Sequence, residues 1–233
     1  MKDSSSTSIS SSAEVAAPSI RRIPLAVKLV YTAFVAVLVP VYLRAYGPTN
    51  FLYFCDVALL LTLAGVWLEN ALLISMCCVG ILLPQLFWLV DFCAQLAGLS
   101  LTGMTEYMFR SSIPLHARGL SLFHGWLPLL LLWLVYRLGY DKRALKAWGL
   151  LAVVLVLVSY LFMPPAGAGL ADPNLPVNIN YVWGLNDSTP QQWMNQSLYV
   201  VVYLIALWLV IYFPTHALLG KCVRNADLST HNR

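Results

Sequence analysis

Charged residues are scarce in this chain, because Lys, Arg, Asp and Glu together make up 10% of its 233 residues. A water-soluble domain carries about 25% of such residues. Hydrophobic residues reach 60%, and the mean hydropathy is +0.74. This composition excludes a soluble globular enzyme. The net charge of +4 is explained below by topology, so we predict no nucleic-acid partner.

Motifs for metals and phosphates are also missing from the sequence. It has no Cys-x-x-Cys, no His-Glu-x-x-His and no glycine-rich phosphate loop. The odd number of cysteines argues against a disulfide framework. We therefore predict no metal and no cofactor. The five cysteines are Cys55, Cys77, Cys78, Cys93 and Cys222.

Long apolar runs fill most of the chain. A helix rises about 1.5 Å per residue, so ~20 residues cross a hydrocarbon core of ~30 Å. Lipid offers no partner for bare main-chain groups, so such runs should be helices. The sequence predicts an all-α polytopic membrane protein with a bundle of six transmembrane helices. The six spans are about 23–45, 51–68, 71–90, 119–138, 147–163 and 198–214.

The basic residues lie mainly on one set of connections between these spans. If the N-terminus is inside, the inner segments hold eleven Lys and Arg residues and the outer segments hold three, Arg44, Arg110 and Arg118. Cytoplasmic loops are enriched in such residues. We therefore predict that both termini are cytoplasmic. The expected location is the cell membrane, in a bacterium the inner membrane.

The first residues differ in composition from the spans. Ser4–Ser12 is serine-rich and lacks the apolar residues needed to pack, so it is predicted to be disordered. We interpret span one as a retained anchor rather than a cleaved signal. The predicted organisation is a disordered cytoplasmic tail at 1–20, a transmembrane domain at 21–220 and a cytoplasmic tail at 221–233.

Polar residues gather in the predicted outer half of the membrane, where they are costly and tend to be functional. Those within the spans are Cys55, Asp56, Gln85, Asp91 and His124. Cys55 and His124 each lie about 9 Å into their spans. The outer loop 164–197 adds Asn180 and Tyr181, and the segment 91–118 is expected to lie over the cluster as a re-entrant or interfacial piece.

Each of these residues also has a structural interpretation. Cys55 can fill space as a small apolar group, and His124 can bond a neighbouring helix. Asp56 can accept a bond between helices, and Asp91 can end a helix. A thiol and an imidazole at one depth can instead form a nucleophile–base pair, if their spans are adjacent.

Three short stretches resemble a known family. They are Asn50-Phe-Leu-Tyr-Phe-Cys-Asp-Val-Ala-Leu59, Phe123-His124-Gly125 and Asn178-Ile-Asn-Tyr181. They resemble motifs of the bacterial YwaF-like integral membrane proteins, which look related to six-span eukaryotic lipid acyltransferases and to androgen-induced-type hydrolases of fatty-acid esters. The resemblance implies a Cys or Thr nucleophile with a His, which maps onto Cys55 and His124.

Three functions remain open from the sequence. The first is an intramembrane lipid acyltransferase or ester hydrolase, with membrane lipid as its partner. In it Cys55 attacks the carbonyl, His124 is the base, Asp56 or Asp91 orients the imidazole, and Asn180 or Tyr181 donates to the oxyanion. Gln85 and Asp91 are further substrate-binding candidates. The second is a small-solute carrier that uses Asp56 and Asp91, and the third is a non-catalytic assembly or scaffold protein.

Overall fold

The computed structural model describes residues 23–231, with side chains to Cys222, and over this part the chain is helical without strands. The serine-rich segment 1–20 lies outside the described residues. Five helical stretches are long and apolar enough to cross a membrane, and a sixth apolar helix, α2 (Phe54–Leu68), is shorter. The five are Leu25–Ala45, Ala71–Leu96, Leu115–Leu138, Ala144–Phe162 and Gln196–Cys222.

Several of these stretches are built from more than one element. The long ones are α1 (Leu25–Ala45), α3 (Ala71–Leu96), α5 (Phe123–Leu138), α6 (Ala144–Phe162), α7 (Gln196–Ala206) and α8 (Phe213–His231). A π-helical segment, η4 (Leu207–Tyr212), joins α7 to α8. Short helices fill the connections: η1 (Pro48–Leu52), η2 (Glu106–Phe109), α4 (Leu115–Leu120) and η3 (Ile179–Tyr181).

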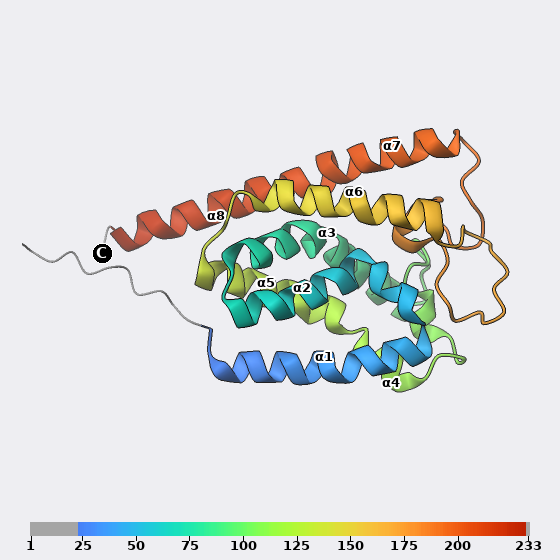
Figure 1. Cartoon of the computed structure of the whole chain (residues 1–233), viewed down its shortest axis with the longest axis horizontal. Coiled ribbons are helices and arrows are strands. Elements are labelled where there is room, and N and C mark those ends of the chain that lie inside the picture. Colours follow the sequence, from blue (N-terminus) through green and yellow to red (C-terminus); the bar gives the residue numbers. More distant parts are fainter. Residues whose placement is uncertain (1–22, 232–233) are drawn as a thin grey trace, which may run out of the picture.

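The connections divide the bundle into two unlike ends (Figure 1). We call the end with residues 46–53, 97–122 and 163–195 the loop end. The opposite end, with the tight connections 69–70 and 139–143, is the turn end. Both the start of α1 and the far end of α8 lie at the turn end (Figure 1).

Helix α3 forms the centre of the bundle, in contact with α2, α5, α6 and η4. Two glycines let neighbouring helices approach closely. The indole of Trp148 on α6 covers Gly80 of α3, and the indole of Trp208 in η4 covers Gly149 of α6. A side chain at either glycine would collide with the facing ring, so these contacts fix how α3, α6 and η4 pack.

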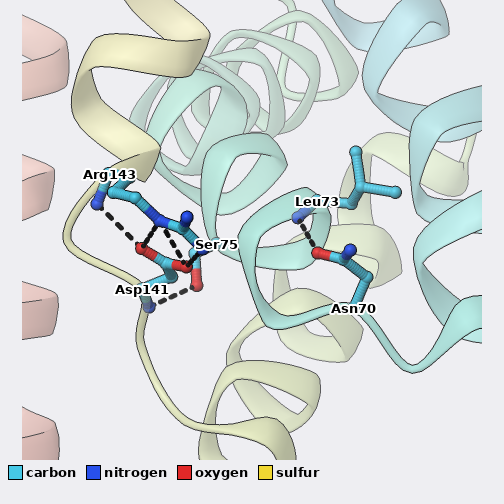
Figure 2. A network of polar contacts seen from close by, with 5 residues as sticks. All are labelled: Asn70, Leu73, Ser75, Asp141 and Arg143. Atoms are coloured by element: carbon cyan, nitrogen blue, oxygen red, sulfur yellow. Dashed lines mark hydrogen bonds and ion pairs between the residues drawn. The ribbon is translucent and has the colours of Figure 1, made fainter.

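The chain between α1 and α2 explains why α2 is short. Gly47 adopts a φ of 75°, in the left-handed region, and Pro48 then begins the tight turn η1. The expected span 51–68 is therefore divided: its first residues form part of η1, and the α-helix begins at Phe54. At the other end of α2, Glu69 takes a left-handed conformation and Asn70 caps α3 through the N–H of Leu73 (Figure 2).

Candidate functional site

Cys55 and Asp56 lie in the first turn of α2, at the loop end. Cys55 is half-buried, and its thiol donates a long hydrogen bond of 3.9 Å to Oδ2 of Asp56. The same oxygen accepts a hydrogen bond of 3.0 Å from Nδ2 of Asn50 in η1. Asp56 is only 3% exposed, and within residues 23–222 its Oδ1 has no hydrogen-bond partner. A buried carboxylate oxygen is thus left available beside a thiol.

Asn180 holds the start of α2 in place. Its Oδ1 accepts from the main-chain N–H of Phe54 at 3.0 Å, and its Nδ2 donates to the carbonyl of Leu52 at 2.9 Å and to Oγ of Ser159 at 3.2 Å. An unpaired N–H at a helix start is costly when buried. Because these bonds use both ends of the amide, Asn180 positions the site, and an oxyanion would have to displace one of them.

Tyr181 follows Asn180 in an unusual main-chain conformation, since its φ is 57°. Its carbonyl accepts from the hydroxyl of Tyr199 at 3.1 Å. Burial raises the pKa of the Tyr181 phenol well above its ordinary value, and nearby Tyr53, Asp187 and Cys55 raise it further. Tyr181 therefore stays a neutral donor at any physiological pH, within electrostatic reach of the Cys55 sulfur.

A second tyrosine reaches the same region from the 97–122 segment. Burial raises the pKa of Tyr107, and Tyr46 and Cys55 are among the nearby groups that raise it further. Tyr46 is buried, and its hydroxyl has no partner among residues 23–222. Tyr181 and Tyr107 are therefore neutral phenols within electrostatic reach of Cys55, and a phenol can donate a hydrogen bond to a carbonyl oxygen.

His124 lies at the start of α5, in a separate aromatic setting. Its Nδ1 is 2.7 Å from the carbonyl of Ser121, its ring stacks on Trp88 at 4.6 Å, and Phe123 lies at 4.1 Å. A carbonyl partner places the proton on Nδ1 and leaves the Nε2 lone pair to accept. Helices α2 and α5 are in contact. Within the described side chains, however, no hydrogen bond joins His124 to Cys55 or Asp56.

Asp91 occupies a structural position near the end of α3. Its two oxygens accept four hydrogen bonds, from the N–H and hydroxyl groups of Thr102 and Thr105, at 2.6–3.1 Å. The carboxylate thereby ties the 97–122 segment to α3. It makes no hydrogen bond to His124 within residues 23–222, so it does not orient the imidazole.

Gln85 differs from Asp91 in having an unsatisfied side chain. It lies on α3, is 2% exposed, and neither its Oε1 nor its Nε2 has a partner among the described side chains. A buried amide normally has hydrogen-bond partners. Gln85 thus remains open to a bound molecule that both donates and accepts.

Sequence reasoning missed some of the residues that build this site. Asn50 lies six positions before Asp56 in the same short stretch, and its polarity at a span boundary was the available signal. Tyr107 was recognisable as a polar residue of the outer segment 91–118, but its place in the site, like that of Ser121, depends on how the 97–122 segment folds back. In comparisons with known proteins, no family model, curated protein or solved structure matches this chain.

The arrangement has the elements of a nucleophilic site whose neighbouring groups are mostly uncharged. It offers a thiol, an adjacent carboxylate with a free oxygen, neutral phenols and, on a contacting helix, an imidazole with one free nitrogen. Such groups suit attack on a carbonyl carbon more than capture of a cation, because the phenols donate rather than coordinate.

Proposed function

We propose that the chain crosses the cell membrane six times, with α2 as the short crossing and the turn end in the cytoplasm. Support comes from the basic residues. Among residues 23–222, six lie on the turn side, namely Lys28, Arg137, Lys142, Arg143, Lys146 and Lys221. Three lie on the loop side, namely Arg44, Arg110 and Arg118. A positive-inside bias of this kind makes both termini cytoplasmic.

Cysteine accessibility on whole cells tests this orientation. Asn186 and Lys142 are exposed at opposite ends of the bundle. In a background without the exposed native Cys93 and Cys222, Asn186→Cys should react with an impermeant thiol reagent and Lys142→Cys should react only after lysis. The opposite pattern reverses the orientation.

We propose further that the site at Cys55 transfers or hydrolyses an acyl group of a membrane lipid. The observation that carries this is the contact of the Cys55 thiol with Asp56, whose second oxygen is unpaired. The resemblance to the YwaF-like proteins and their lipid-processing relatives points to the same residues. Lipid is the natural substrate class for a reactive thiol placed within an apolar bundle.

In the proposed reaction, the Cys55 sulfur attacks the carbonyl carbon of a lipid ester. The thiol proton passes to Asp56, or to Nε2 of His124 if substrate binding brings the two helices' side chains together. Tyr181 or Tyr107 donates to the carbonyl oxygen as it gains charge. The C–O bond then breaks, the alcohol leaves with the proton, and a thioester remains on Cys55. A second alcohol or water takes the acyl group and returns the proton to the thiol.

Capture of the thioester is the direct test. The purified chain is incubated in vesicles with a phospholipid carrying a labelled acyl chain, and the label on each cysteine is measured by mass spectrometry. We expect hydroxylamine-sensitive label on Cys55, absent in Cys55→Ala and reduced at least about tenfold in Asp56→Asn and His124→Ala. Cys78→Ala, which removes a buried mid-helix thiol of α3, is the matched control and should keep full labelling.

Two results would reject the lipid-acyl proposal. One is label on Cys93 or Cys222 that is independent of Cys55, since that is surface acylation. The other is no thioester with any ester tested, which leaves the carrier and scaffold alternatives. The four bonds to Asp91 weigh against a carrier that needs this carboxylate to bind its solute.

A further inference from the structure

A groove of about 390 Å³ runs between α1 and the start of α4, on the outside of the bundle. Its floor is apolar or small, with Ala36, Val37 and Val41 of α1, and two basic side chains, Arg44 and His116, stand at its loop-end rim. Both basic residues are exposed. The groove therefore combines a hydrocarbon-like floor with a rim that carries the guanidinium of Arg44 and the imidazole of His116.

Within residues 23–222 the rim of the groove has no counter-charge. Across residues 23–222 neither Arg44 nor His116 makes an ion pair or a side-chain hydrogen bond, whereas Lys28 is paired with Glu69 and Arg143 with Asp141. Arg44 lies in the last turn of α1. For a helix that crosses the bilayer, this is the level of the lipid phosphates.

The floor carries an additional polar feature. Pro40 lies inside α1 and has no N–H, so the carbonyl of Ala36 one turn earlier lacks its usual helical donor. Ala36 and Pro40 both line the groove. Apart from this one carbonyl, the floor offers apolar contact to a molecule that fills the groove.

We propose that this groove binds one glycerophospholipid, with its phosphate on Arg44 and His116 and an acyl chain along Val37 and Val41. Arginine suits a phosphate because its planar fork donates two parallel hydrogen bonds. A soluble phosphate ester would leave the apolar floor uncovered, which favours a lipid. This site lies apart from Cys55, and the proposal is independent of the acyl chemistry there.

Native mass spectrometry of the full chain, released from detergent with one lipid at a time, tests the site. Dioleoylphosphatidylglycerol is compared with dioleoylglycerol, which has the same chains without phosphate, and with glycerol 3-phosphate, which has no chains. We expect one retained phosphatidylglycerol, at least about tenfold weaker retention of dioleoylglycerol, and no retention of glycerol 3-phosphate.

Variants assign the phosphate contact. Arg44→Gln should weaken retention of phosphatidylglycerol at least about tenfold. Arg44→Lys keeps the charge but loses the fork and should restore only part of it, and His116→Gln should have a smaller effect than Arg44→Gln in the same direction. Arg110→Gln, which removes an exposed arginine at the same end but outside the groove, is the control and should bind as the unaltered chain does.

Three outcomes overturn the proposal. Equal retention of dioleoylglycerol means that the groove binds acyl chains but does not recognise the phosphate. Retention of glycerol 3-phosphate means that a free phosphate ester is the ligand. Unchanged retention in Arg44→Gln, with the thermal unfolding midpoint also unchanged, means that the lipid sits elsewhere. Thioester formation at Cys55 is measured on the same variants and should be unaffected, which separates this site from the proposed reaction.

Discussion

Helices α2 and α3 start in different ways: the start of α3, at the turn end, is capped by a neighbour in the chain, whereas the start of α2, at the loop end, is held by a residue far away in the chain. Asn70 caps the N–H of Leu73, and Arg143 bonds Asp141 two residues before it (Figure 2). At the loop end, Asn180 bonds Phe54 and Leu52, which precede it by 126 and 128 residues.

This difference shows what each helix start requires in order to form. A local cap forms together with its own helix, and its loss costs little elsewhere. The bonds of Asn180 exist only when the 163–195 segment is packed on the start of α2, and several buried polar atoms at this end, among them Oδ1 of Asp56, stay unpaired within residues 23–222. Unpaired buried groups are costly, which is typical of a region kept for a ligand rather than for stability alone.

The largest effect should come from removing the long-range cap. Asn180→Ala leaves the N–H of Phe54 and the carbonyl of Leu52 without partners, at about 1–3 kcal/mol each. We expect it to lower the free energy of unfolding by about 3 kcal/mol or more. Thermal unfolding in detergent, followed by tryptophan fluorescence, measures this.

The matched control is the local cap at the other end. Asn70→Ala removes one bond to the N–H of Leu73 and should cost about 1 kcal/mol. If the two alanine variants are equally destabilised, the contrast between the two helix starts fails.

A next prediction concerns the carboxylate that ties the 97–122 segment to α3. The hydroxyl of Thr105 is buried and donates to Oδ2 of Asp91 at 2.6 Å, whereas Thr102 is exposed and donates to Oδ1 at 2.8 Å. Thr105→Val should cost about 2 kcal/mol and Thr102→Val less than about 1 kcal/mol, because water replaces only the exposed donor. Equal losses would mean that water reaches both oxygens.

Substitutions of Gln85 test whether its unpaired amide atoms bind a water or lipid molecule. With no partner for a buried amide, Gln85→Leu should raise stability by about 1 kcal/mol, since an apolar group of similar size removes the penalty. Gln85→Ala is the control for volume and should destabilise the chain by leaving a cavity. A destabilised Gln85→Leu variant would reveal a water or lipid bonded to the amide.

The smallest effect is predicted at the turn end, where pH acts on Asp141. The hydrogen bonds from Arg143 hold the pKa of this carboxyl below its ordinary value. A lowered folded-state pKa stabilises the fold above the ordinary value near 4, and this contribution is lost as the pH falls further. The unfolding midpoint should drop slightly more between pH 5 and pH 3 in the unaltered chain than in Asp141→Asn. No difference between them would show that solvent screens the pair completely.

Hydropathy was sufficient to locate the helices but not their ends. The apolar runs predicted an all-helical membrane protein, and the helices lie where the runs do. The start of α2 was missed because it depends on the left-handed Gly47 and on Asn180, far away in the chain. The end of α3 extends beyond residue 90, since Thr102 and Thr105 satisfy Asp91 and let a charged residue remain in the helix.

The candidate site was predictable in depth but not in rotation. Equal distance from the span ends brought Cys55 and His124 to the same half of the bundle. The direction in which a helix presents a side chain depends on its neighbours. His124 lies against Trp88 and the Ser121 carbonyl because the helix is interrupted between α4 and α5. Asp56, the residue next to Cys55, makes the contact that was expected of His124.

If α2 crosses the membrane as proposed, its length has a consequence for the surrounding lipid. Its 15 residues span about 22 Å, well short of a hydrocarbon core of ~30 Å. Hydrophobic mismatch of this size is relieved when the bilayer thins locally. Headgroups and water would then approach the level of Cys55 along α2, so short-chain lipids should favour the protein, and membrane thickness becomes a variable that controls access to the thiol.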